Sequence, residues 1–108
     1  MIMDDEAQIS IIEKNGETII TGSGSLTFMN ATKFGDELKQ ASLNADRVTV
    51  DLRSAVFIDS QIVQDLGRAA VALTKRGKRL RALFLETAYP LQVLKIVGFE
   101  EIMDVEVE

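Results

Sequence analysis

The pair Asp59-Ser60 is the part of the sequence whose residue types most directly suggest chemistry. It follows the apolar run Val56-Phe57-Ile58 and precedes a stretch of helical periodicity, so Ser60 would lie at the N-terminal end of a helix. Unpaired amide groups and the positive end of the helix dipole favour an anion there. Ser60 is therefore a candidate phosphoacceptor. The alternative is that Asp59 or Ser60 only caps the helix, a role worth about 1 kcal/mol.

Residues that support other kinds of catalysis are few. The chain contains no Cys and no His, which excludes thiol redox chemistry and removes the usual zinc ligands and imidazole bases. Asp51 and Asp59 lack a basic or nucleophilic constellation, so no carboxylate pair for hydrolysis can be assigned. Gly22-Ser23-Gly24 does not continue into a phosphate-binding motif, and we interpret it as a turn. We therefore predict a protein that is not an enzyme, has no catalytic residues and binds neither a metal nor another cofactor.

The overall charge narrows the class of partner. A net charge of -5 disfavours nucleic acid, because affinity for nucleic acid comes mainly from Lys and Arg that neutralise phosphates. Residues 1–6 are acidic, unlike a signal peptide, and no apolar run approaches the roughly 20 residues that span a bilayer. We expect a cytoplasmic protein with a protein partner, no nucleic acid ligand and no direct insertion into a membrane.

Two clusters of charged residues lie in the C-terminal half. Basic residues are concentrated between Arg68 and Arg81 and could form a patch for an anionic partner or a membrane surface. The alternative is a solvated face in which the cations compensate the helix C-terminus. Acids in residues 100–108 alternate with apolar residues, as in an exposed edge strand, and we interpret them as protection of that edge.

The N-terminal half is predicted to form a hairpin and a helix. Residues 7–13 and 18–21 carry strand patterns, and Lys14-Asn15-Gly16 between them is a strong hairpin signal. The next apolar residues fall at spacings of three and four, which is typical of a helix with Asn30 or Thr32 as its N-cap. These apolar residues are Ala31, Phe34, Leu38 and Ala41.

The rest of the chain alternates between strands and helices. Strands are predicted at residues 47–52, 80–85 and 102–107, with a short connection at residues 56–58. A second helix begins at Ser60 and ends at Lys75-Arg76-Gly77, and a third begins at Tyr89-Pro90 and ends at Gly98.

This order of elements predicts a single α/β domain over residues 1–108. Helices that connect successive strands favour parallel pairing and right-handed crossovers. We therefore expect a mixed β-sheet with a parallel core and an N-terminal antiparallel hairpin, with the helices packed mainly on one face.

A set of residues between positions 48 and 98 matches a known pattern. It comprises Asp51-Leu52, Val56-Phe57-Ile58-Asp59-Ser60, Leu66, Lys75-Arg76-Gly77, Leu80 and Val97-Gly98-Phe99. With these residues the chain resembles a STAS domain, the fold of bacterial anti-sigma factor antagonists and of the cytosolic tails of SulP anion transporters. Once the hairpin and residues 25–38 are included, the resemblance covers nearly the whole chain.

The resemblance implies a regulatory role for the Asp-Ser junction. In the antagonist branch, the Ser that follows the Asp is phosphorylated by a partner kinase, and the match carries this role to Ser60. The implied partners are an anti-sigma factor with serine kinase activity and a serine phosphatase, and phosphorylation expels the anti-sigma factor. The implied partner-binding residues are Asp59, Ser60, Gln61 and Ile62 at the second helix, and Ser25, Thr27 and Asn30 before the first.

Two other functions stay open. The segment Leu26-Thr27-Phe28-Met29-Asn30-Ala31-Thr32-Lys33-Phe34 is similar to one that is common in SulP tails. This chain would then be the cytosolic regulatory domain of a sulfate or bicarbonate transporter, and its partner would be the transporter membrane domain. Ser60 would then only cap the helix. A nucleotide-binding or enzymatic α/β domain is the third hypothesis, for which the sequence offers no phosphate loop or catalytic set.

Overall fold

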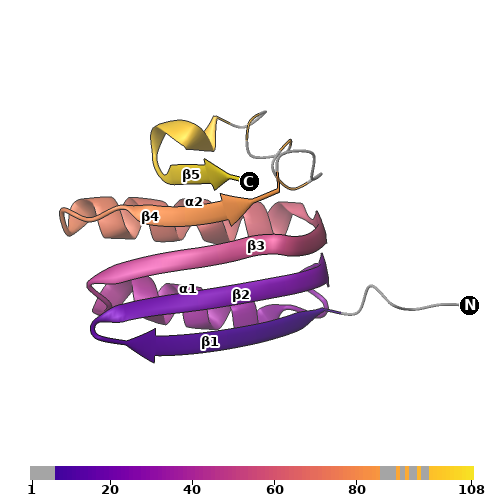
Figure 1. Cartoon of the computed structure of the whole chain (residues 1–108), viewed down its shortest axis with the longest axis horizontal. Coiled ribbons are helices and arrows are strands. Elements are labelled where there is room, and N and C mark those ends of the chain that lie inside the picture. The colour runs from indigo at the N-terminus through magenta and orange to yellow at the C-terminus, as the bar shows by residue number, and fades with distance from the viewer. Residues whose placement is uncertain (1–6, 86–89, 91, 93–94, 96–97) are drawn as a thin grey trace, which may run out of the picture.

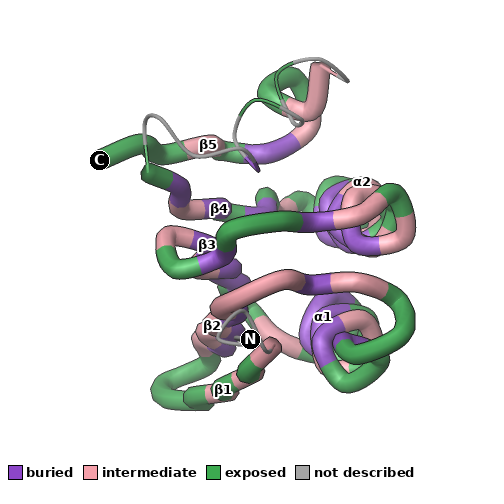
Figure 2. Tube along the Cα trace, turned by 90° about the vertical axis from the view of Figure 1, so that its right-hand side faces the viewer, coloured by how far each residue is buried: buried purple, intermediate pink, exposed green. Residues whose placement is uncertain are grey.

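Within the described part of the chain, five strands form one mixed sheet in which the spatial order follows the order along the chain, β1-β2-β3-β4-β5. The structure is a computed structural model that describes residues 7–85, 90, 92, 95 and 98–108. Strands β1 and β2 are antiparallel, and all later pairs are parallel. Figure 1 shows the strands in this order, and Figure 2 shows both long helices on the same face of the sheet. The predicted fold class is confirmed.

The hairpin forms at the predicted turn. Strands β1 (Gln8–Lys14) and β2 (Glu17–Leu26) are joined by Asn15 and Gly16, which have φ angles of 53° and 81°. Two consecutive residues with positive φ give a turn whose twist matches that of paired strands, and Asn-Gly adopts it most readily.

Two connections predicted around the sheet are in fact strand. Strand β2 continues through Gly22-Ser23-Gly24, so the predicted turn there is wrong; β-bulges absorb the irregularity, and Gly24 has a φ of 78°. Strand β3 (Arg47–Ile58) likewise continues through residues 56–58, where a connection was expected. The two strands stay in parallel register up to the pair Leu26↔Ile58. Backbone pairing between distant segments outweighs the local turn signals.

Helices α1 (Thr32–Asn44) and α2 (Ser60–Lys75) cover one face of the sheet. The predicted apolar positions of both helices are buried or packed against the core. Helix α2 ends as expected before Gly77, whose φ of 75° suits a residue without a Cβ. The core lies between helices and sheet, and its largest fully buried side chains include Phe34, Leu66 and Phe84.

The C-terminal part adds strands β4 (Leu80–Phe84) and β5 (Asp104–Val107), as predicted, with a 3-10 turn η1 (Phe99–Glu101) before β5. The third predicted helix falls largely on residues outside the described part of the chain. None of the helices that the structure describes has the length and apolar character needed to span a bilayer.

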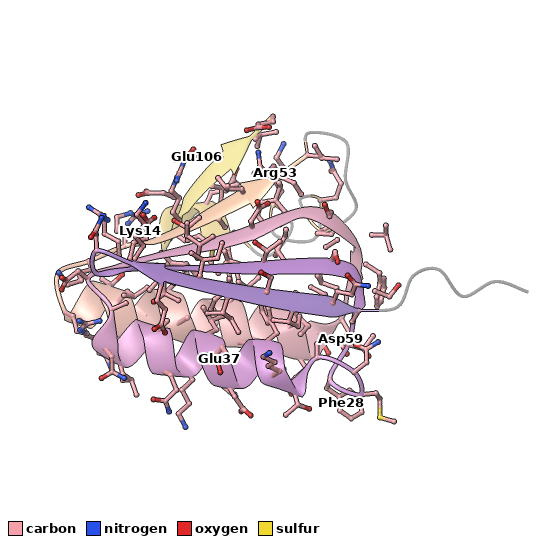
Figure 3. The ribbon with its side chains drawn as sticks, turned by 60° about the horizontal axis from the view of Figure 1, so that its bottom comes forward. Lys14, Phe28, Glu37, Arg53, Asp59 and Glu106 are labelled. Carbon is pink, nitrogen blue, oxygen red and sulfur yellow. The ribbon has the colours of Figure 1, made fainter. Side chains whose placement is uncertain are left out.

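Charged side chains cover the sheet face that points away from the helices. Arg53 holds the Asp51 carboxylate with two hydrogen bonds, Nε–Oδ1 3.0 Å and Nη2–Oδ2 2.8 Å, and also contacts Glu108 at 2.8 Å. Asp51 therefore does have a basic neighbour, contrary to the sequence-based expectation. Arg81 pairs with Glu106 at 2.6 Å, and Figure 3 shows Arg53 and Glu106 on the side opposite the helices. Both acids of the edge strand β5 are thus paired: Glu106 with Arg81 on β4, and Asp104 with Arg79, directly before β4, at 2.8 Å.

Candidate functional site

The candidate site lies where β2 and β3 end side by side. Leu26 and Ile58 are register partners at these ends, and the Asp59 amide donates to the Leu26 carbonyl at 3.1 Å. Both predicted groups of site residues, before α1 and at the start of α2, thereby lie at the same end of the sheet, where β2 and β3 end. The labels of Phe28 and Asp59 in Figure 3 mark this end of the molecule.

Asp59 uses both carboxylate oxygens to join the two groups. Oδ1 accepts from the Ile62 amide at 3.0 Å, which is the N-cap bond of α2, and Oδ2 accepts from the Phe28 amide at 3.0 Å. Of the two caps considered from the sequence, Asp59 is the cap and Ser60 is not. The carboxylate therefore fixes the helix start and the loop that precedes α1 at once.

Ser60 is the first residue of α2 and is exposed. Because Asp59 occupies the cap position, the Ser60 hydroxyl is not needed to satisfy the amides of the helix N-terminus. A chemical change at this hydroxyl would therefore leave the Asp59 cap bond intact.

The loop before α1 is a compact turn closed by Asn30. The Asn30 Oδ1 accepts from the Thr27 amide at 3.0 Å, and the Asn30 and Ala31 amides donate back to the Thr27 carbonyl at 3.1 and 2.8 Å. The expectation that Asn30 or Thr32 caps α1 is wrong, because the cap position is Ala31 and makes no side-chain cap bond. Ser25, on the last residues of β2, is half-buried beside this turn.

Two exposed apolar side chains at this turn were missed in the sequence. Phe28 is 59% exposed and Met29 is 78% exposed. The signal that could have found them is that neither fits the spacing of three and four residues that places Ala31, Phe34 and Leu38 in the core. Adjacent exposed apolar residues at a loop tip are typical of a contact surface.

The start of α2 separates the predicted partner residues into two classes. Ile62 is 0% exposed and belongs to the core, so its predicted place on a docking surface is wrong. It points inward because it lies one turn before the buried Leu66. Gln61 is half-buried instead, and its Nε2 donates to Asp65 Oδ1 at 3.1 Å.

A groove of about 540 Å³ runs between α1 and α2 from this end of the molecule; we call it the near groove. The helices approach closely at Gly35, where a Cβ would lie 2.7 Å from Asp65 Oδ2. Burial in the groove raises the pKa of the Asp65 carboxyl, while the Gln61 hydrogen bond and the charge of Arg68 lower it, and Asp59 and Asp36 raise it further.

Three carboxylates lie near one another at the start of α2, which begins at Ser60, and the near groove beside them also contains Lys39 and Arg68. Asp59 precedes Ser60 directly, and Asp36 and Asp65 line the near groove. Among the residues that the structure describes, no group of three or more acidic side chains is arranged to hold a metal ion.

Comparisons with known proteins agree with this architecture. The family model described as "Mlab, STAS domain" matches residues 10–104, which is most of the chain. No curated protein matches the sequence.

Several solved structures share the fold. An anti-sigma factor antagonist from Mycobacterium paratuberculosis superposes with a TM-score of 0.80 at 14% identity, covering 98% of this chain and 90% of that one. A STAS domain protein from Planctomyces limnophilus, described as an anti-sigma-factor antagonist, gives 0.71 at 15% identity, with coverage of 93% and 90%. At such identities these structures show the likeness of fold, and the family match rests on the sequence itself. Because the family model matches residues 10–104, the chain belongs to the STAS domain family.

Proposed function

We propose that this chain is a non-enzymatic regulatory STAS domain, formed by residues 1–108, that binds a protein partner in the cytoplasm and is switched by phosphorylation of Ser60. The observation that carries the proposal is that Asp59, and not Ser60, caps α2. The exposed Ser60 hydroxyl is therefore not required for the helix cap. Similarity to anti-sigma factor antagonists supports an anti-sigma factor with serine kinase activity as the partner.

In this proposal the unmodified surface docks on the kinase. The surface consists of Ser60 and Gln61 on α2 and of the turn from Thr27 to Asn30, with Phe28 and Met29 as its apolar part. The kinase supplies ATP: the Ser60 Oγ forms a bond to the γ-phosphorus, the bond to the β,γ-bridging oxygen breaks, ADP leaves, and the hydroxyl proton passes to the kinase. A serine phosphatase reverses the modification by hydrolysis.

Phosphorylation expels the partner through charge. The phosphate brings close to two negative charges beside Asp59 and next to the near groove, which contains Asp36 and Asp65. The helix N-terminus stabilises this phosphate, so the fold tolerates it. The partner instead meets negative charges and a strongly hydrated phosphate at the place where it had an apolar contact.

The test compares two substitutions of one residue. Affinity for the anti-sigma factor kinase from the same genome is measured for Ser60→Asp, Ser60→Ala and a matched control, Ser10→Asp, on exposed β1. We expect Ser60→Asp to weaken binding by at least tenfold, about 1.4 kcal/mol, and Ser60→Ala to bind normally but to accept no phosphate. If Ser60→Asp bound as tightly as the control, the switch would be refuted.

The second candidate is the regulatory domain of a SulP-type anion transporter. The observation that favours it is the segment Leu26 to Phe34, which is similar to SulP tails and carries the exposed side chains of Phe28 and Met29. These side chains would then contact the transporter membrane domain. The complete gene decides, because a transporter would encode a series of apolar spans before the STAS domain.

A further inference from the structure

The groove between the helices continues beyond Arg68 into a second hollow of about 720 Å³ at the C-terminal end of α2, which we call the far groove. Its apolar lining includes Leu43 and Val71, which are 53% and 44% exposed, and the ring of Phe99. Gly67 allows this ring to lie against α2, because a Cβ there would be 2.9 Å from Phe99 Cζ. The far groove is therefore a concave apolar surface built by α1, α2 and η1.

The charged residues of the far groove are all cations. Its lining contains Arg68, Lys75 and Arg76 and no carboxylate. Arg76 Nη1 donates to the Ser42 carbonyl at 2.9 Å, which places the guanidinium across the space between the helices, and Arg68 Nη2 contacts Gln64 Oε1 at 3.4 Å. Neither contact neutralises the charge, although Arg68 also interacts through space with Asp65.

This arrangement is unusual for the molecule. The chain carries a net charge of -5, and on the sheet face Arg53, Arg79 and Arg81 each pair with a carboxylate at 2.8 Å or less. Among the described residues, Arg68, Lys75 and Arg76 make no such ion pair. An apolar floor with a rim of cations that form no salt bridge is complementary to a segment that has an apolar face and acidic residues beside it.

We propose that the far groove binds an acidic amphipathic helix of a protein partner. A third helix fits the groove between two packed helices because its ridges of side chains enter the existing groove. A concave floor suits such a segment better than a flat bilayer, for which protruding apolar residues are needed. The inference does not rest on the Ser60 switch, because the far groove lies toward the other end of α2.

The experiment uses a synthetic amphipathic peptide of about 15 residues, long enough to form a helix on binding, with Leu on one face and Glu on the other. A matched peptide carries Lys in place of every Glu. Fluorescence anisotropy measures binding of both to the full chain, to the double variant Arg68→Glu/Lys75→Glu, and to Arg47→Glu, the same type of charge reversal on an exposed residue of β3. Circular dichroism verifies that each variant is folded.

We expect saturable binding of the Glu peptide, no comparable binding of the Lys peptide, and a loss of affinity of at least tenfold in the double variant. Arg47→Glu and Ser60→Asp should bind the Glu peptide like the unmodified chain, so failure of the phosphoswitch and failure of this proposal give different results. Equal binding of both peptides, or unchanged affinity in the double variant, would overturn the proposal. So would binding to phosphatidylserine vesicles, abolished in the double variant, without binding of the Glu peptide.

Discussion

Asp51 and Asp65 lie on opposite sides of the same sheet and in opposite electrostatic surroundings. Asp51 lies on the sheet face that points away from the helices, which we call the open face. There the hydrogen bonds from Arg53 hold the pKa of the Asp51 carboxyl below its ordinary value. In the groove between the helices, burial raises the pKa of the Asp65 carboxyl, and its side-chain partner is the neutral Gln61.

The difference extends from these two residues to whole surfaces. Arginines and carboxylates of the open face are mutually neutralised, and such a face offers little net field to a partner. In the helix layer, the near groove contains Asp36 and Asp65 together with Lys39 and Arg68, whereas the charged side chains of the far groove are all cations. Ion pairs thus join the charges of the open face, whereas Arg68, Lys75 and Arg76 of the helix layer form none within the described residues.

The largest expected effect concerns the inner side of the helix layer. Ile62→Ala should lower the free energy of unfolding by about 2–5 kcal/mol, because Ile62 is fully buried and leaves a cavity. Gln61→Ala, the neighbouring half-buried position, should cost less than about 1 kcal/mol. Urea denaturation measures both. Equal losses would mean that the two sides of α2 do not differ as described.

The next effect separates cap from phosphoacceptor. Asp59→Ala should cost about 1–2 kcal/mol, because it removes the acceptor of the Ile62 amide and also frees the Phe28 amide. Asp59→Asn keeps an acceptor and should cost less. Ser60→Ala should change the unfolding free energy by no more than about 0.5 kcal/mol. The assignment of the cap would be contradicted if Ser60→Ala were the more damaging substitution.

The contributions of Asp51 and Asp65 to the free energy of unfolding should depend on pH in opposite directions. For Asp51, whose pKa is lowered on folding, the stabilisation is present above the ordinary carboxyl range near about pH 4 and disappears as the pH falls through the folded-state pKa. Asp51→Asn should therefore be less stable than the unmodified chain at neutral pH, with a gap that closes in acid.

Asp65 should behave in the reverse manner. Because folding raises its pKa, stability is lost as the pH rises from the ordinary carboxyl range through the folded-state pKa. Asp65→Asn, which can still accept the Gln61 hydrogen bond, should be more stable than the unmodified chain at neutral pH, and the gain should vanish in acid. Denaturation curves measured across the acidic range test both variants, with Glu13→Gln on β1 as the control. If Asp51→Asn and Asp65→Asn changed the stability in the same direction at neutral pH, the predicted difference between the two carboxylates would be refuted.

The smallest effect is expected from a single ion pair on the open face. Both side chains of the Arg79–Asp104 pair are about half exposed, at 45% and 57%. Arg79→Met should therefore cost less than about 1 kcal/mol, and high salt should reduce the loss further. Thermal denaturation at two salt concentrations measures this, and a larger, salt-independent loss would show that the pair is structurally essential.

Local signals account for the parts that could be predicted from the sequence. The Asn15-Gly16 turn and both ends of α2, up to Gly77, depend on residues within a few positions of one another. The continuation of β2 through Gly22 to Gly24 depends instead on pairing with β3, some thirty positions later, and no local pattern announces it. The Asp59–Phe28 bond joins residues 31 positions apart. The sequence predicts that Asp59 or Ser60 caps α2, but it does not predict that Asp59 also binds the Phe28 amide.

The sequential order of the strands bears on how the chain acquires its structure. Among the strands that the structure describes, each pairs only with the strand before it and the strand after it in the chain. No strand has to wait for a distant segment to enter between two neighbours that are already present, so each closure spans a modest length of chain and costs correspondingly little loop entropy. The sheet can grow from the hairpin outward as synthesis proceeds, with α1 and α2 each packing onto strands already formed.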